Sequence, residues 1–138
     1  MSLVHTGRCA CGTVRYETTG DPIRLSACHC KECQLRTGSA FGVGCYFLST
    51  DVKVLGGNLQ TYERSSGSGH WVKLQFCRAC GTTVLWTFEA MLEATGIATG
   101  TFDDTDWIMP TLHVWAKSAQ AWTHFPEDAE VFSESTLG

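Results

Sequence analysis

The stretch Cys28-His29-Cys30-Lys31-Glu32-Cys33 places three cysteines within six residues. Thiolates at positions i, i+2 and i+5 can converge on one metal ion if the backbone curls around it, as turns do around zinc. Three protein ligands leave one position of a tetrahedral ion open, which is the arrangement of a reactive zinc site and not of a structural one. The stretch therefore predicts a metal site with an open face.

Four further cysteines form two pairs that are distant in the sequence. The first pair is Cys9 and Cys11, and the second is Cys77 and Cys80. The second pair, followed by Gly81, is a strong zinc-knuckle pattern, whereas a Cys-x-Cys pair alone is a weak one. We expect the two pairs to make one closed four-thiolate site, which would add folding free energy and leave no room for a substrate.

The type of ligand narrows the reaction expected at the triad of Cys28, Cys30 and Cys33. Three thiolates donate strongly to zinc, so such an ion activates water less well than one held by three histidines. Soft thiolate ligands suit the binding and exchange of another thiolate, and a zinc-bound thiol is deprotonated at neutral pH. We therefore expect a small thiol as the substrate at the open position.

The sequence leaves other interpretations of the triad open. It could be a second structural zinc site with His29, Cys45 or a distant histidine as fourth ligand. Two of its thiols could instead cycle through a disulfide in a redox sensor, or the chain could be a zinc-stabilised scaffold that only binds a partner. We expect His29 to point away from the metal into the packing, Cys45 to be a buried thiol, and His113 to be a hydrogen-bonded structural histidine.

Basic residues near the triad are candidates for binding the carboxylates of an acidic thiol. Lys31 and Arg36 flank the triad, and Arg24 precedes it. Basic side chains that are exposed are more often simply solvated, which is the alternative for all three.

Length and composition indicate the size of the domain that carries these sites and the partners that it excludes. The 138 residues are the size of one domain, and 43% hydrophobic residues, with five Trp and seven Phe, can fill its core. We expect a single domain over residues 1–138, with a core at about residues 4–125 and a polar, loosely held C-terminal tail. The net charge of −4 argues against a nucleic-acid backbone as the main partner. Exposed aromatic residues could form a homodimer interface.

The eight cysteines also bear on the compartment in which the protein works. The N-terminus lacks a basic stretch followed by an apolar run, and no segment has the length and apolar character of a membrane span. We therefore expect a cytoplasmic protein, in which clustered cysteines are kept reduced and serve metal or redox chemistry.

Alternating apolar and polar residues predict many short strands separated by glycine-rich turns, which is typical of an all-β domain. One helical turn is expected at residues 31–36, closed by Gly38. Residues 91–101 fit a helix or a strand, and we favour a strand. The other strands are expected at residues 13–17, 23–27, 39–47, 52–55, 59–63, 70–76, 83–88 and 111–115.

Together these motifs resemble the glutathione-dependent formaldehyde-activating enzyme family, which includes centromere protein V. The resemblance extends from about Val4 to Phe125. It is carried by Gly7-Arg8-Cys9-Ala10-Cys11-Gly12-Thr13-Val14-Arg15-Tyr16, by Cys28-His29-Cys30-Lys31-Glu32-Cys33 with Thr37-Gly38-Ser39-Ala40-Phe41, by Phe76-Cys77-Arg78-Ala79-Cys80-Gly81-Thr82, and by Leu112-His113-Val114-Trp115 and Trp122.

The resemblance implies a β-tent fold, shared with a small zinc-bearing Rab-binding exchange chaperone, made here of short antiparallel strands. It implies two zinc ions per chain: a structural one on Cys9, Cys11, Cys77 and Cys80, and a catalytic, more labile one on Cys28, Cys30 and Cys33. It also implies a carbon–sulfur lyase that adds glutathione to formaldehyde and gives S-hydroxymethylglutathione.

Overall fold

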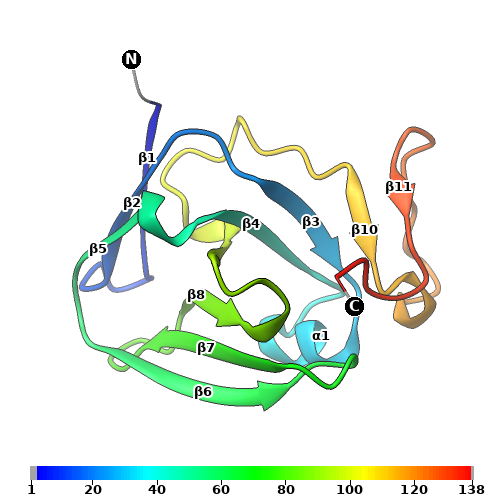
Figure 1. Cartoon of the computed structure of the whole chain (residues 1–138), viewed down its shortest axis with the longest axis horizontal. Coiled ribbons are helices and arrows are strands. Elements are labelled where there is room, and N and C mark those ends of the chain that lie inside the picture. The colour runs from blue at the N-terminus through cyan, green and yellow to red at the C-terminus, as the bar shows by residue number, and fades with distance from the viewer. Residues whose placement is uncertain (1–2, 138) are drawn as a thin grey trace.

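Eleven strands form two sheets in the computed structural model, which describes residues 3–137 (Figure 1). The smaller sheet has the order β1-β2-β5, and the larger sheet has the order β11-β10-β3-β4-β9-β8-β7-β6. Strands hold 43% of the residues and helices 14%, so the expected mainly β fold with little helix is confirmed.

The elements lie close to the ranges expected from the sequence. Among residues 3–137 there is one α-helix, α1 at Lys31–Thr37, and none of the helices combines the length and apolar character that a membrane crossing needs. The strands are β1 Val4–Arg8, β2 Arg15–Thr19, β3 Arg24–Cys28, β4 Gly42–Leu48, β5 Val52–Gly56, β6 Leu59–Ser65, β7 Trp71–Cys77, β8 Thr83–Phe88, β9 Ala94–Ala98, β10 Leu112–Val114 and β11 Glu130–Val131.

Three of these elements, β1, β9 and β11, differ from the expectation. No strand was predicted at β1, because its side chains do not alternate between apolar and polar and its only buried residue is Gly7. The strand favoured for residues 91–101 is confirmed only at β9, since 3₁₀ turns occupy Glu89–Met91 and Thr99–Thr101 on either side of it.

The pairing of β10 corrects the expectation of antiparallel strands throughout. Strand β10 runs parallel to β3 on one side and to β11 on the other, while the remaining pairs are antiparallel. A parallel pair needs a long crossover, and here the chain travels from β3 through most of the sheet before it returns. The crossover places His113 beside Ala27 and Val114 beside Cys28, at the start of the cysteine triad.

The C-terminal segment is held against the body, contrary to the expected loose tail. Strand β11 pairs with β10, and the backbone N–H of Ala116 donates to the carbonyl of Phe132 at 3.0 Å. Lys117 forms an ion pair with Glu134. The segment then turns inward, where Leu137 packs on an apolar cluster, and Figure 1 shows it crossing toward the end of β3. Backbone hydrogen bonds hold the C-terminal segment in place, and the acidic composition of the segment does not predict them.

The large sheet has an apolar cluster on each of its two faces. Alternation along the strands separates them: on β4, Cys45 and Phe47 enter the cluster shared with Tyr16 of the small sheet, whereas Tyr46 faces the other way. The second cluster contains Val72, Leu74, Trp86, Phe88 and Ala94. It lies on the face of the sheet that also carries the first residues of the triad.

Gly96 makes room for the aromatic part of this second cluster. A Cβ added to Gly96 would lie 2.3 Å from Nε1 of Trp86 and 2.8 Å from a ring carbon of Tyr46. We expect Gly96→Ala to lower the free energy of unfolding by about 1–3 kcal/mol, because a well-packed site must then shift to accept a methyl group. Urea unfolding followed by tryptophan fluorescence measures this loss.

The matched control is Gly100→Ala, since nothing lies within 4 Å of an added Cβ at Gly100. Equal stability of the two variants would contradict the close packing of Trp86 over β9.

Candidate metal centres and cavity

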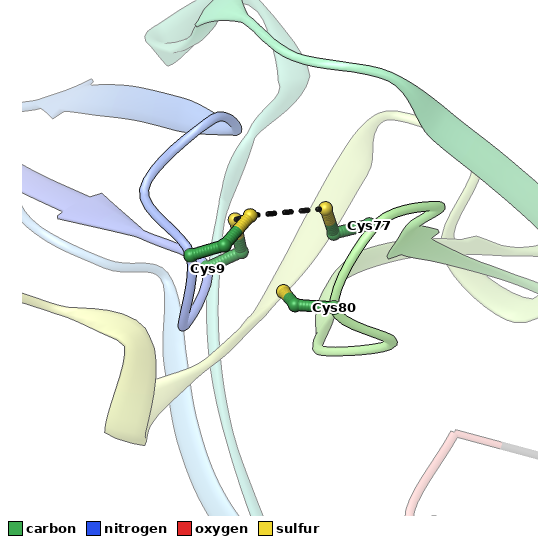
Figure 2. Close-up of side chains that lie close together, drawn as sticks. Cys9, Cys77 and Cys80 are labelled. Carbon is green, nitrogen blue, oxygen red and sulfur yellow. Dashed lines mark hydrogen bonds between the residues drawn. The ribbon is translucent and has the colours of Figure 1, made fainter.

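Four cysteine sulfurs meet where two hairpin loops face each other. Cys9 and Cys11 come from the loop between β1 and β2. Cys77 ends β7, and Cys80 lies in the loop that follows it. Figure 2 shows the three labelled cysteines pointing toward a common centre. All four sulfur atoms lie within 4.8 Å of one another. The two loops are 66 residues apart at Cys11 and Cys77, whose sulfurs are 3.7 Å apart.

Each loop turns tightly around its sulfurs. The N–H of Gly12 donates to the carbonyl of Cys9 at 3.1 Å, and the N–H of Gly81 donates to the carbonyl of Cys77 at 2.8 Å. Both glycines have φ near +80°, a left-handed conformation that other residues adopt at a cost. This is why a glycine follows the second cysteine of each pair.

The distances in this group fit a zinc ion. Four sulfurs at about 2.3 Å from a tetrahedral zinc lie about 3.8 Å from one another. The Cys9 and Cys11 sulfurs are 3.6 Å apart, and the Cys11 and Cys77 sulfurs are 3.7 Å apart. The four cysteines are free thiols, and together they could hold a metal ion with no position left over.

The triad is built at the junction of β3 and α1. Cys28 ends β3, Cys30 caps α1 and Cys33 lies in the first turn of the helix. The backbone N–H of Cys33 donates to the sulfur of Cys30 at 3.4 Å, and the sulfurs of Cys28 and Cys30 are 3.3 Å apart. The helical turn expected at residues 31–36 is confirmed and ends at Gly38. This helical turn brings Cys33 back toward β3.

The three sulfurs of the triad also lie within 4.8 Å of one another and could hold a metal ion. Within residues 3–137, no fourth His, Cys, Asp or Glu joins this group. Hydrogen bonds from Cys28 and Cys33 lower the pKa of the Cys30 thiol well below its usual range, and the same sharing raises the pKa of Cys28. One sulfur of the group is thus prepared to be a thiolate, the form that binds metals.

Neither of the nearby alternative ligands joins the triad. His29 is fully buried, and its Nε2 lies 3.0 Å from Nδ1 of His113, with Phe41 and Phe125 packed against the pair. Burial lowers the pKa of both histidines, so the pair is neutral. Cys45 is fully buried in the core cluster on the other face of β4. The expectations for these three residues are confirmed.

A cavity of about 130 Å³ opens beside the triad. Alternate residues of β3 line one side, namely Arg24, Ser26 and Cys28, since every second side chain of a strand lies on one face. Aromatic and apolar side chains form much of the remaining wall, and Ser135 and Leu137 of the C-terminal segment close part of it. The aromatic members are Tyr46, Trp71, Trp86, Phe88 and Trp115.

The positions of the basic residues partly match the expectation. Arg24 and Arg36 line the cavity, but Lys31 is exposed and borders a different surface hollow with Gln34. Lys31 points away because it starts a helix whose other face carries Cys33. Arg64 also lines the cavity and was missed, since it lies 31 residues after the triad on β6.

Trp115 is a second residue whose place in the cavity was not predicted from the sequence. It has φ +57°, the only positive φ of a residue other than glycine within residues 3–137. Its ring lies where a Cβ on Gly67 would come within 2.6 Å. Strained backbone of this kind persists where the surrounding structure fixes it, and here it turns an aromatic ring toward the cavity.

Comparison with family models gives a match over residues 4–118 to the model described as "Glutathione-dependent formaldehyde-activating enzyme". The chain belongs to this family. A crystal structure of a Rhodobacter sphaeroides protein has a similar fold, with a TM-score of 0.59 over 74% of this chain and 91% of that chain, at 22% identity. At that identity the likeness concerns the fold alone. Comparison with curated proteins gives no match.

Membership of the formaldehyde-activating family supports an enzyme whose chemistry concerns formaldehyde and glutathione. The matched range contains both cysteine groups as well as Arg24, Arg36, Arg64 and Trp115. The two groups could bind metal, which is consistent with the expected zinc. The resemblance noted in the sequence is therefore confirmed at the level of the family.

The burial of Cys45 leads to a prediction about thiol reactivity. Burial raises the pKa of Cys45 to about 12, so at pH 8 only about one thiol in ten thousand is ionised. Since the thiolate is the reactive form, we expect Cys45 to escape alkylation by iodoacetamide in the folded protein after chelator treatment, while the exposed Cys11 and Cys80 are labelled. Peptide mass spectrometry measures the extent at each site.

Labelling in denaturant is the control, and there Cys45 should react like the others. Rapid labelling of Cys45 in the folded protein would contradict its place in the core.

Proposed function

We propose that the protein is a zinc-dependent enzyme of the carbon–sulfur lyase type that acts on a small thiol adduct. The adduct in view is that of glutathione and formaldehyde, S-hydroxymethylglutathione. The observation that carries the proposal is the set of three converging sulfurs at the wall of a cavity, with no fourth protein ligand among residues 3–137. A purely structural site has no need of an incomplete ligand set beside a cavity.

Two zinc sites with different roles follow from the two cysteine groups. Cys9, Cys11, Cys77 and Cys80 would hold a structural zinc that joins two hairpin loops. Cys28, Cys30 and Cys33 would hold the catalytic zinc and are the catalytic residues of the proposal. When bound there, zinc would lower the pKa of a substrate thiol and keep its sulfur nucleophilic at neutral pH.

The reaction itself is an addition that needs no other reactant. The thiol sulfur forms a bond to the formaldehyde carbon, the carbon–oxygen double bond becomes a single bond, and the thiol proton ends on that oxygen. The reverse reaction breaks the carbon–sulfur bond and returns the proton to sulfur. The aromatic wall of the cavity, including Trp86 and Trp115, would exclude water from the small aldehyde.

The remaining features of the proposal concern the whole chain. We propose that it works as a single domain, in the cytoplasm, with a small thiol as its partner and without nucleic acid or membrane. The free cysteines support a reducing compartment. A homodimer through exposed aromatic residues, of which Trp122 is 63% exposed, is part of the same proposal.

Removing one ligand from each group tests the two roles separately. We expect about two zinc ions per chain in protein purified without chelator, and about one in Cys30→Ser and in Cys77→Ser. Cys30→Ser should keep its thermal midpoint and lose catalysis. Cys77→Ser should unfold at a lower temperature, because its zinc contributes to folding. Elemental analysis gives the zinc content, and NMR exchange between free and glutathione-bound ¹³C-formaldehyde gives the rate above the uncatalysed background.

Retained exchange activity in Cys30→Ser would overturn the catalytic role of the triad. One tightly held zinc, unchanged by glutathione, would favour a binding scaffold instead. A disulfide among Cys28, Cys30 and Cys33 after mild peroxide, with matching zinc release and no exchange activity, would favour a redox sensor.

A further inference from the structure

The cavity beside the triad contains three arginines from three separate elements. Arg24 comes from β3, Arg36 from α1 and Arg64 from β6, and all three line the cavity with the triad. Their guanidinium groups are close enough to the thiols to act on them electrostatically, Arg24 on Cys28, Arg36 on Cys33 and Arg64 on Cys30.

These arginines supply more positive charge than the triad itself requires. A divalent ion held by three thiolates formally carries about one negative charge, which one guanidinium would balance. Among the described residues, one carboxylate is within ion-pair distance of the three arginines: Oε2 of Glu32 lies 3.7 Å from Nε of Arg64. One guanidinium remains in excess and would balance a substrate thiolate, so a second anionic group on the ligand would take the place of Glu32 at Arg64.

Arg64 has few hydrogen-bond partners among the residues that the structure describes. Its side chain is 13% exposed, and its Nε is buried without a hydrogen-bond partner within residues 3–137. Its Nη1 donates to the carbonyl of Ser65 at 3.3 Å, and Glu32 lies too far away for a hydrogen bond. A buried guanidinium donor without a partner costs free energy, which a carboxylate with two oxygens could recover.

Arg36 is held in place by its planar face, which leaves its edge available. Its guanidinium carbon lies 4.9 Å from the centre of the Trp86 ring. Gly42 gives it space, because an added Cβ there would lie 2.4 Å from a guanidinium nitrogen of Arg36 and 3.5 Å from Cβ of Cys33. Stacking on an aromatic ring orients the arginine and leaves its N–H groups free for a carboxylate.

We propose that Arg36 and Arg64 bind a carboxylate of the thiol substrate while its sulfur lies at the triad. Glu32 forms an ion pair with Arg64 in the free protein, and the substrate's carboxylate replaces Glu32 in this ion pair. The inference rests on the proposed function, since it names the residues that bind the acidic part of the proposed thiol substrate at the same site. Arg36 and Arg64 are then residues that determine specificity.

The size of the cavity limits what can lie inside it. Pockets that enclose drug-sized ligands measure roughly 300–1,000 Å³, whereas this cavity measures about 130 Å³. A sulfur, a short carbon link and a carboxylate fit within that volume. A larger acidic thiol would extend into the neighbouring hollow of about 460 Å³, which is also lined by Glu32, Arg36 and Arg64.

Two probes of nearly equal size test the inference. Mercaptoacetate carries a carboxylate next to its thiol, and mercaptoacetamide carries a neutral amide in the same place. We expect the zinc-loaded full chain to bind mercaptoacetate at least about tenfold more tightly, as charge-assisted bidentate hydrogen bonds would allow. Arg36→Gln and Arg64→Gln should lose this preference and bind the amide as before. Isothermal titration calorimetry measures each Kd.

The control variant is Arg15→Gln, because Arg15 is exposed on β2 and outside the cavity. It should keep the full preference for mercaptoacetate. Glu32→Gln should bind mercaptoacetate severalfold more tightly than the unaltered protein, with no change for the amide, because the competing carboxylate is gone.

Two results would overturn the inference. The first is an unchanged preference for mercaptoacetate in both arginine variants. The second is an equal loss of affinity for both probes, together with loss of zinc, which would show that the arginines only balance the charge of the thiolates. Both measurements are made without formaldehyde and without turnover. Failure of the lyase reaction would therefore leave the preference for an acidic thiol intact, and lyase activity without that preference would refute this inference alone.

Discussion

The meeting of sulfur atoms from separate loops is the constraint on which the rest of the structure depends. Cys11 and Cys77 are 66 residues apart, yet their sulfurs are 3.7 Å apart. The approach joins the edge of the small sheet to the β7–β8 hairpin of the large one, and the core cluster containing Cys9 and Cys77 lies behind it. A metal bound there would add its binding free energy to folding, because the site exists only when both loops are in place.

The triad differs from the four-cysteine group, because its three sulfurs come from one short segment and not from two distant loops. Cys28 ends a strand and Cys33 lies in the first turn of a helix, so local structure alone brings them together. What surrounds the triad is not local. The wall of the cavity comes from β3, α1, β4, β6, β7, β8, β10 and the C-terminal segment. The reactive sulfurs can be specified within six residues, whereas the substrate space depends on the whole fold.

The charge of the arginines and the apolar wall of the cavity both favour the binding of an anionic ligand. The aromatic wall lowers the local dielectric, which strengthens the attraction between a guanidinium and an anion. Arg36 is fixed on Trp86, and Arg64 has a buried N–H donor without a hydrogen-bond partner in the described part of the chain. The buried histidine pair behind the triad, His29 with His113, is neutral and links β3 to the returning strand β10. It supports the position of the cysteines while leaving the charges of the cavity to the arginines.

The sequence by itself determined the mainly β class, the helical turn after Cys30 and the cysteine triad, because each depends on spacing within a few residues. It also predicted that the two distant cysteine pairs meet, from the four ligands that a closed zinc site needs. It also assigned His29 and Cys45 to buried positions from their neighbours alone. Only the tertiary structure decided the parallel pairing of β10, the inward turn of Leu137 and the presence of Arg64 beside Cys30. These depend on which strands become neighbours, and neither periodicity nor composition carries that information.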